Sequence, residues 1–114
     1  MTYENALQII ETEFETRTDS PHNKIIKTGL TYNGCNGFCV SVYNSPRGVL
    51  ITDLGQTKEI FDEVSEDEWI ALCNEHGFAF NHWCITRPFT TIKDVHEFIE
   101  FLDFVSDKFW DCED

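Results

Sequence analysis

Apolar residues near the N-terminus recur with the period of an amphipathic helix. They stand at i, i+3, i+4, i+7 and i+11, which is one face of a helix with 3.6 residues per turn: Tyr3, Ala6, Leu7, Ile10 and Phe14. Thr2 comes directly before them and is a suitable N-cap. Residues 16–21 are mostly turn and loop formers, so we expect the helix to give way to a loop there.

Between residues 24 and 53 the pattern changes to the period of two that is typical of strands. Apolar and more polar residues alternate over 38–43, which predicts a half-buried strand. Residues 44–48, Asn-Ser-Pro-Arg-Gly, supply a turn, and residues 49–52 form the returning strand. A further strand starts at residues 25–26. We expect short strands arranged as a meander.

Two later segments begin with helix-start signals. Residues 65–68, Ser-Glu-Asp-Glu, form a capping box, and the helix that it opens is expected to end at Gly77. Residues 91–94, Thr-Ile-Lys-Asp, form a similar start for the longest helix, which runs to about Trp110. A short helix over 57–64 and two short strands around 81–82 complete the order.

This succession of elements predicts the fold class. Strands concentrated in the first half and helices at both ends are typical of an α+β protein. We expect one domain over residues 1–114, in which a small antiparallel sheet packs against an N-terminal helix and a long C-terminal helix.

The predicted last helix has two contrasting faces when residues are spaced at about 100° around its axis. Its apolar face consists of Ile92, Val95, Phe98, Ile99, Leu102, Val105 and Phe109. The opposite face carries a row of carboxylates, here called the acidic stripe: Glu97, Glu100, Asp103, Asp107 and Asp111. Phe104 lies within the stripe, where an unburied aromatic ring is a natural anchor for a protein contact.

The acidic stripe has two interpretations. A charged outer face keeps a small domain soluble without binding anything. Alternatively, carboxylates that recur about every 5 Å along a helix resemble the closely spaced phosphates of a nucleic-acid strand. A helix of that kind suits a basic, nucleic-acid-binding groove on another protein.

The overall charge limits the class of partner. The chain has 21 acidic against 8 basic side chains and a formal net charge of −13, which repels nucleic-acid phosphates and anionic membranes. An apolar fraction of 41% is enough to build a core and argues against disorder. The first residues lack the basic and apolar regions of a signal peptide, and the longest apolar run, residues 69–73, is far too short to span a membrane. We therefore expect a cytosolic protein.

Cysteine and histidine form a second group of candidate residues. The chain has 5 cysteines, an odd number that argues against a disulfide framework. Cys35 and Cys39 form a Cys-x₃-Cys turn, Cys73 and His76 stand at i and i+3, and Cys84 lies on the predicted hairpin. A structural zinc site and buried, inert thiols both account for these residues.

Enzyme signatures are absent from the sequence. It contains no Gly-rich phosphate loop, Gly-x-Ser-x-Gly elbow or His-Glu-x-x-His helix. A Cys–His nucleophile built from Cys73 or Cys84 with His76 or His82 is an alternative. Burial would raise the pKa of such a thiol and leave it unreactive. We expect no catalysis.

One short motif resembles a known family. Residues 50–55, Leu-Ile-Thr-Asp-Leu-Gly, end a predicted strand and precede a predicted helix. They are similar to a family of bacterial and phage domains of unknown function with a strand, a Thr-Asp-Asp-Gly turn and a helix, except that Leu54 replaces the second Asp. The resemblance covers roughly residues 25–110, implies an α+β architecture and carries over no catalytic residue. In structural terms, Asp53 can accept backbone N–H bonds and Gly55 can supply a positive φ.

The sequence therefore predicts a non-catalytic inhibitor or regulator that binds a basic nucleic-acid-binding protein as a nucleic-acid mimic. In size, charge and solitary domain it is similar to phage-encoded anti-CRISPR inhibitors. The predicted contact residues are Glu97, Glu100, Asp103, Phe104, Asp107, Asp111 and Trp83. The alternatives are a metal-stapled accessory domain, a Cys/His-dependent enzyme, and a structural subunit whose acidic face only confers solubility.

Overall fold

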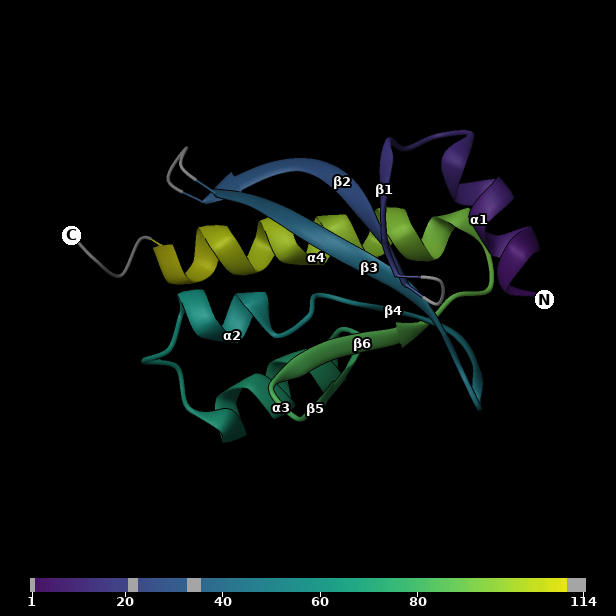
Figure 1. Cartoon of the computed structure of the whole chain (residues 1–114). Helices are drawn as coiled ribbons and strands as arrows, with labels where there is room; N and C mark the ends of the chain where they lie inside the picture. Colours follow the sequence, from purple (N-terminus) through teal and green to yellow (C-terminus); the bar gives the residue numbers. More distant parts are fainter. Residues whose placement is uncertain (1, 21–22, 33–35, 111–114) are drawn as a thin grey trace.

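A computed structural model describes residues 2–20, 23–32 and 36–110 (Figure 1). The elements in chain order are α1 Tyr3–Glu11, β1 Thr16–Ser20, β2 Asn23–Tyr32, β3 Asn36–Ser45, β4 Gly48–Thr52, α2 Gln56–Ile60, α3 Glu66–Glu75, β5 Ala79–Asn81, β6 Cys84–Pro88 and α4 Ile92–Trp110. The described strands form one sheet in the order β1-β2-β3-β4-β6-β5, and every neighbouring pair is antiparallel. The predicted α+β class, with an antiparallel sheet, an N-terminal helix and a long C-terminal helix, is confirmed.

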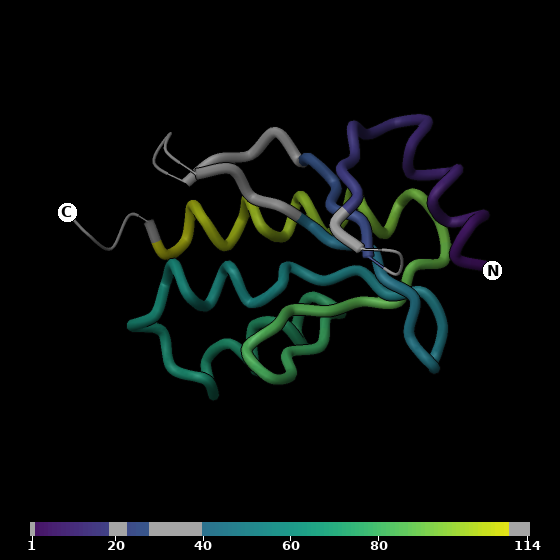
Figure 2. The backbone as a smooth tube through the Cα atoms, in the orientation of Figure 1, coloured from purple at the N-terminus to yellow at the C-terminus, as the bar shows by residue number. Residues whose placement is uncertain are grey.

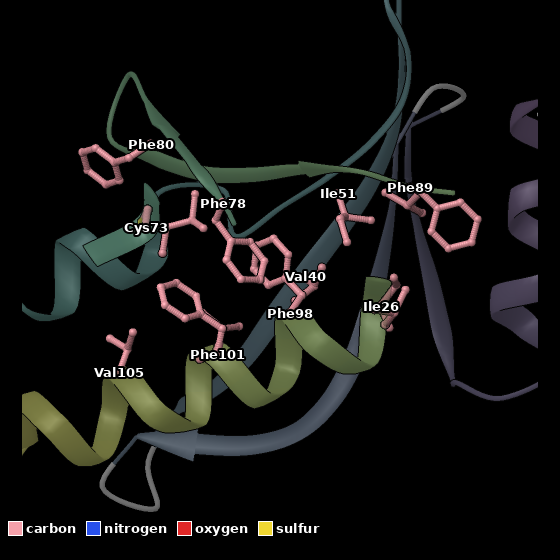
Figure 3. Packing of buried hydrophobic residues seen from close by; sticks show 14 of the residues in the cluster. Ile26, Val40, Ile51, Cys73, Phe78, Phe80, Phe89, Phe98, Phe101 and Val105 are labelled. Carbon is pink, nitrogen blue, oxygen red and sulfur yellow. The ribbon is translucent and has the colours of Figure 1, made fainter. Parts of the chain in front are cut away.

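One apolar core joins the inner face of the sheet to the helices. Val40, Val42, Ile51 and Ile85 alternate with outward side chains along their strands and are fully buried. All four described helices contribute side chains to the same cluster or pack against it. In Figure 3, Phe98 and Phe101 point from α4 toward the strands and α3, while Figure 2 shows α4 running along the length of the molecule. The helices therefore occupy one side of the sheet.

The predicted helix starts are confirmed by their hydrogen bonds. Thr2 Oγ1 accepts from Asn5 N at 3.2 Å, and Ser65 Oγ accepts from Glu68 N at 3.2 Å. The start of α4 has a similar cap, which links the Asp94 carboxylate to the two residues before the helix. Their backbone nitrogens, of Thr90 and Thr91, donate to Asp94 Oδ2 at 2.7 and 2.9 Å. Each cap satisfies N–H groups that have no partner inside the helix.

The predicted end of α3 is also confirmed. Gly77 has φ 84°, a conformation that other residues adopt only at a cost. Beyond it, Phe78 N donates to Cys73 O at 2.8 Å, which closes the last turn of α3 and directs the chain into β5. Phe78 is thereby placed against the ring of Phe101, with the centroids 4.5 Å apart.

Several boundaries predicted from the sequence were wrong. Residues 16–20 form the edge strand β1, not a loop, because Arg17 and its neighbours find partners along β2. The first helix ends at Glu11, before Phe14. β3 has 10 residues instead of being short, and the turn of the last hairpin is at residues 82–83, one position later than expected. The meander predicted for the strands between residues 24 and 53 is confirmed, since β2, β3 and β4 are neighbours in chain order, and β4 also pairs with β6.

Candidate functional site

The two faces of α4 differ as its pattern predicts. Val95, Phe98 and Leu102 are fully buried in the core. The acidic stripe lies on the outer side, where its described members are all exposed: Glu97, Glu100, Asp103 and Asp107. Its fifth predicted member, Asp111, lies outside the described residues. Because its inner face is packed, the helix holds the exposed carboxylates in a fixed row.

An exposed aromatic ring lies beside the stripe, as predicted. Phe104 retains 43% of its surface in contact with solvent. Its ring is 4.9 Å from the ring of His76, which in turn is 5.2 Å from that of Phe101 (centroid distances). These rings line a shallow hollow of about 280 Å³, whose lining also includes Arg87, Glu97 and Glu100. Phe104 is therefore supported from one side and free on the other.

The charges of the stripe are not equivalent, because one arginine lies at its beginning. Arg87 Nη2 is 3.1 Å from Glu97 Oε1, and Arg87 Nε is 3.3 Å from Asp94 Oδ1. Burial alone would raise the pKa of Asp94, but hydrogen bonds from Thr90 and Thr91 and the Arg87 charge hold that pKa below its ordinary value. Glu97 thus already has a basic partner within the chain.

The C-terminal part of the stripe has no ion pair of this kind in the described part of the chain. None of the ion pairs within residues 2–20, 23–32 and 36–110 involves Glu100, Asp103 or Asp107. The uncompensated carboxylates are the three that flank Phe104. Arg87 could not be placed beside α4 from the sequence, since no local pattern joins a strand residue to the outer edge of the following helix.

Trp83 was predicted as a further contact residue, but the structure does not bring it to the stripe. It is 52% exposed in the turn between β5 and β6, with Lys58 Nζ 5.0 Å from its ring centre. Trp83 shares a hollow with Glu66 at the start of α3, whereas Phe104 contacts His76 at the end of that helix. A helix of 10 residues separates these ends by about 15 Å.

The candidate metal ligands are not brought together. Cys73 is fully buried in the core, His76 lies exposed against Phe104, and Cys84 is on the outward face of β6. Cys35 lies outside the described residues, as does the side chain of Cys39 on β3. Within the described part of the chain, no group of three or more His, Cys, Asp or Glu side chains could hold a metal ion.

The two described thiols have the properties of unreactive cysteines. Burial, with a smaller contribution from the Asp53 charge, raises the pKa of Cys73 to about 12. Burial and the same charge also raise the pKa of Cys84, although a hydrogen bond with Thr52 opposes that shift. Both groups are protonated near neutral pH, which makes them poor nucleophiles.

The turn that resembles a family motif has the structural role expected of it. Asp53 is buried, and its Oδ1 accepts from the backbone nitrogens of Gly55 and Ile85, each at 2.9 Å. Its Oδ2 accepts from Thr57 N at 3.2 Å. Burial raises the pKa of Asp53, while the hydrogen bonds from Thr57, Gly55 and Ile85 act in the opposite direction. Gly55 has φ 76°, as the turn chemistry predicts. The carboxylate fastens the end of β4 to α2 and β6.

Comparisons with models of known protein families, with curated proteins and with solved structures found no match. Among the helices of the described residues, none combines the length and apolar character needed to cross a membrane.

Proposed function

We propose that this chain is a non-catalytic binding protein whose acidic stripe and Phe104 dock on a basic surface of another protein. The observation that carries this proposal is an exposed aromatic ring flanked by three carboxylates without basic partners among the described residues. A ring of this kind supplies apolar contact at the centre of an interface, and the charges around it select the partner.

The partner we propose is a nucleic-acid-binding protein, and the consequence of docking is inhibition or regulation. Glu100, Asp103 and Asp107 follow one another at i, i+3 and i+7 along α4. With 1.5 Å of rise per residue, the carboxylates recur about every 4.5 to 6 Å, a linear density of charge that a phosphate-binding groove accommodates. Occupation of such a groove excludes nucleic acid, as in the anti-CRISPR inhibitors that the chain resembles in size and charge.

The two parts of the surface act on different rate constants. Carboxylates steer a basic partner over about a Debye length, so they raise the association rate and make it sensitive to salt. Phe104 acts only after contact, and its loss speeds dissociation. A surface that serves solubility alone has neither property.

A matched pair of charge-reversal variants tests the proposal. The first carries Glu100→Lys, Asp103→Lys and Asp107→Lys, and the control carries Glu4→Lys, Asp62→Lys and Glu63→Lys, which are exposed elsewhere and change the net charge equally. Glu97 is left intact because it pairs with Arg87. Each protein is immobilised and used to capture partners from a lysate of the producing cell or its host.

We expect the natural sequence and the control to retain a nucleic-acid-binding protein that duplex DNA or RNA displaces, and the stripe variant to lose it. If both variants lost the partner equally, the net charge of the protein would account for binding and the stripe would have no specific role. Retention unchanged by the stripe variant, or insensitive to competing nucleic acid, would overturn the proposal.

A further inference from the structure

The outward face of the sheet contains a groove on the side away from the core. Its centre is formed by neighbouring strands in register, since Tyr43 pairs with Leu50 and Thr52 pairs with Thr86. These side chains alternate with the buried ones on the same strands, so they project from the opposite face. The groove has a volume of about 540 Å³, within the range of small-molecule sites. Figure 1 shows β3 and β6 passing in front of α4 and α3, so the face of the sheet away from these helices is turned toward the viewer.

The groove has few ionisable side chains in a protein that is otherwise strongly acidic. Tyr43, Leu50 and Leu54 give it an apolar surface, while Asn44 and Asn81 supply amide groups. Among its described lining residues there is no Asp, Glu, Lys or Arg side chain, and the imidazole of His82 is the one basic group. A cationic ligand would find no carboxylate there, and an anion would be repelled by the field of the whole protein.

The two acidic groups in the groove also stay neutral. Burial raises the pKa of the Tyr43 hydroxyl, and the nearby Cys84 adds to this shift. The pKa of the Cys84 thiol is raised as described above. Both groups are therefore protonated at neutral pH, and they offer hydrogen bonds without charge.

Strained backbone at the rim is a second, independent observation. Leu54 and His82, which both line the groove, have φ angles of 61° and 52°. Residues with a Cβ adopt this left-handed region at a cost, and Asn, Asp or Gly normally occupies it. Leu54 also leaves half of its surface exposed. An unfavourable backbone conformation at a residue with an exposed apolar side chain is typical of a binding position.

The strained turns are held together by one carboxylate. Asp53 accepts hydrogen bonds from both Gly55 and Ile85, so the turn that carries Leu54 is fixed against β6. A Cβ at Gly55 would lie 3.4 Å from Trp83 O, which shows how closely the two turns approach. The rim is therefore formed before any ligand arrives.

We propose that this groove binds an uncharged aromatic small molecule that carries hydrogen-bonding groups at its edge. The aromatic part of the ligand packs on Tyr43, Leu50 and Leu54, and the amides of Asn44 and Asn81 pair with its polar edge. This site is separate from the acidic stripe, and none of its lining residues belongs to the surface proposed above for protein binding.

Three naphthalene compounds that share one ring system and differ in the charge and hydrogen-bonding groups of their substituent test the proposal. They are 2-naphthamide, which is neutral, 2-naphthoate, which is anionic, and 2-naphthamidine, which is cationic. Each is titrated into the full-length, isotopically labelled protein while backbone amide NMR shifts of β3, β4 and β6 are followed. We expect 2-naphthamide to shift the amides of Tyr43, Leu50 and Thr86 with saturation, and both charged analogues to bind the groove at least about tenfold more weakly.

Two variants and a control tie that binding to the groove. Leu54→Asn suits the left-handed backbone better, so we expect a higher melting temperature together with about fivefold weaker binding of 2-naphthamide. Thr86→Phe fills the groove and should abolish binding, whereas Thr18→Phe makes the same change at an exposed position on β1 and should leave it intact.

Three results would overturn the proposal. They are the absence of groove shifts with 2-naphthamide, equal binding of the three compounds, and an unchanged affinity in both groove variants. None of them bears on the acidic stripe, whose test uses different residues and a different readout.

Discussion

The outer face of α4 and the open face of the sheet are built on opposite principles. The first is a helix surface with a row of carboxylates and one ring, and it acts through a field that reaches beyond contact. The second is a groove without Asp, Glu, Lys or Arg side chains among its described lining residues, and it acts only on what enters it. The net charge of −13 is therefore unevenly distributed, because carboxylates line the last helix and the described lining of the groove has none. Composition alone describes neither surface.

The largest expected effect comes from comparing two phenylalanines on opposite faces of α4. Phe98 is fully buried and meets Phe78 edge to face, with ring centroids 5.2 Å apart, whereas Phe104 is 43% exposed. We expect Phe98→Ala to lower the free energy of unfolding by about 3–5 kcal/mol and Phe104→Ala by less than about 1 kcal/mol. Urea denaturation measures both. Equal losses would mean that Phe104 belongs to the core and is no contact residue.

The next effect concerns Asp53, whose hydrogen bonds fix the rim of the groove. In Asp53→Asn, an amide donor replaces the oxygen that accepts from Thr57 N, so one buried hydrogen bond is lost and two donors face each other. We expect a loss of about 2 kcal/mol in the free energy of unfolding. The same variant should weaken 2-naphthamide binding and leave the NMR shifts of Glu100 and Asp103 unchanged. Shifts that spread to α4 would show that the two surfaces are coupled.

A smaller effect, dependent on pH, comes from the cap of α4. Asp94→Ala removes an acceptor of two backbone N–H groups, and we expect a cost of about 1–2 kcal/mol at pH 7. The pKa of Asp94 is lower in the folded chain than its ordinary value of 3.8, so its stabilisation is complete above that value. It is lost as pH falls through the folded pKa.

The difference in unfolding free energy between the natural protein and Asp94→Ala should therefore shrink on acidification below about pH 4. Glu97→Ala is the control, since Glu97 shares Arg87 but is half exposed, and it should cost no more than about 0.5 kcal/mol. A gap that stays constant between pH 7 and pH 2.5 would contradict this account of the cap.

The smallest effect has the opposite sign. Asp107 stands four residues after Asp103 and near the C-terminus of α4, where the helix dipole disfavours negative charge. We expect Asp107→Asn to raise the free energy of unfolding by about 0.3–0.5 kcal/mol at low salt and to have no effect in 1 M salt. A loss of stability would mean that Asp107 is used inside the fold, which would remove it from the proposed interface.

Local patterns predicted those parts of the structure that depend on neighbours in the sequence. Thr2, Ser65 and Asp94 are recognisable as caps because their partners lie within four residues. The apolar face of α4 follows from one period, and Phe101, which the prediction omitted, lies at the border of that face. The exposure of Phe104 was predicted by the same geometry.

Features that join distant segments could not be predicted. β1 is a strand because β2 offers it a partner, which no property of residues 16–20 reveals. Cys73 and Cys84 fall on opposite sides of the sheet, so their nearness in sequence to His76 was misleading. The groove draws its lining from β2, β3, β4 and the β5–β6 hairpin, and its neutrality appears only when these segments meet. The partner of the acidic stripe stays a prediction.

The pairing of β4 with β6 has a consequence for the order in which the molecule can be assembled. The hydrogen bond that closes this junction joins Asp53 to Ile85, 32 residues later. While the chain is being synthesised, β1 to β4 can pair as soon as they emerge, but β4 then presents an open edge until β6 follows α2, α3 and β5. An unpaired strand edge invites association with other chains. The edge of β4 is thus covered only once the carboxyl-terminal half of this protein has been made.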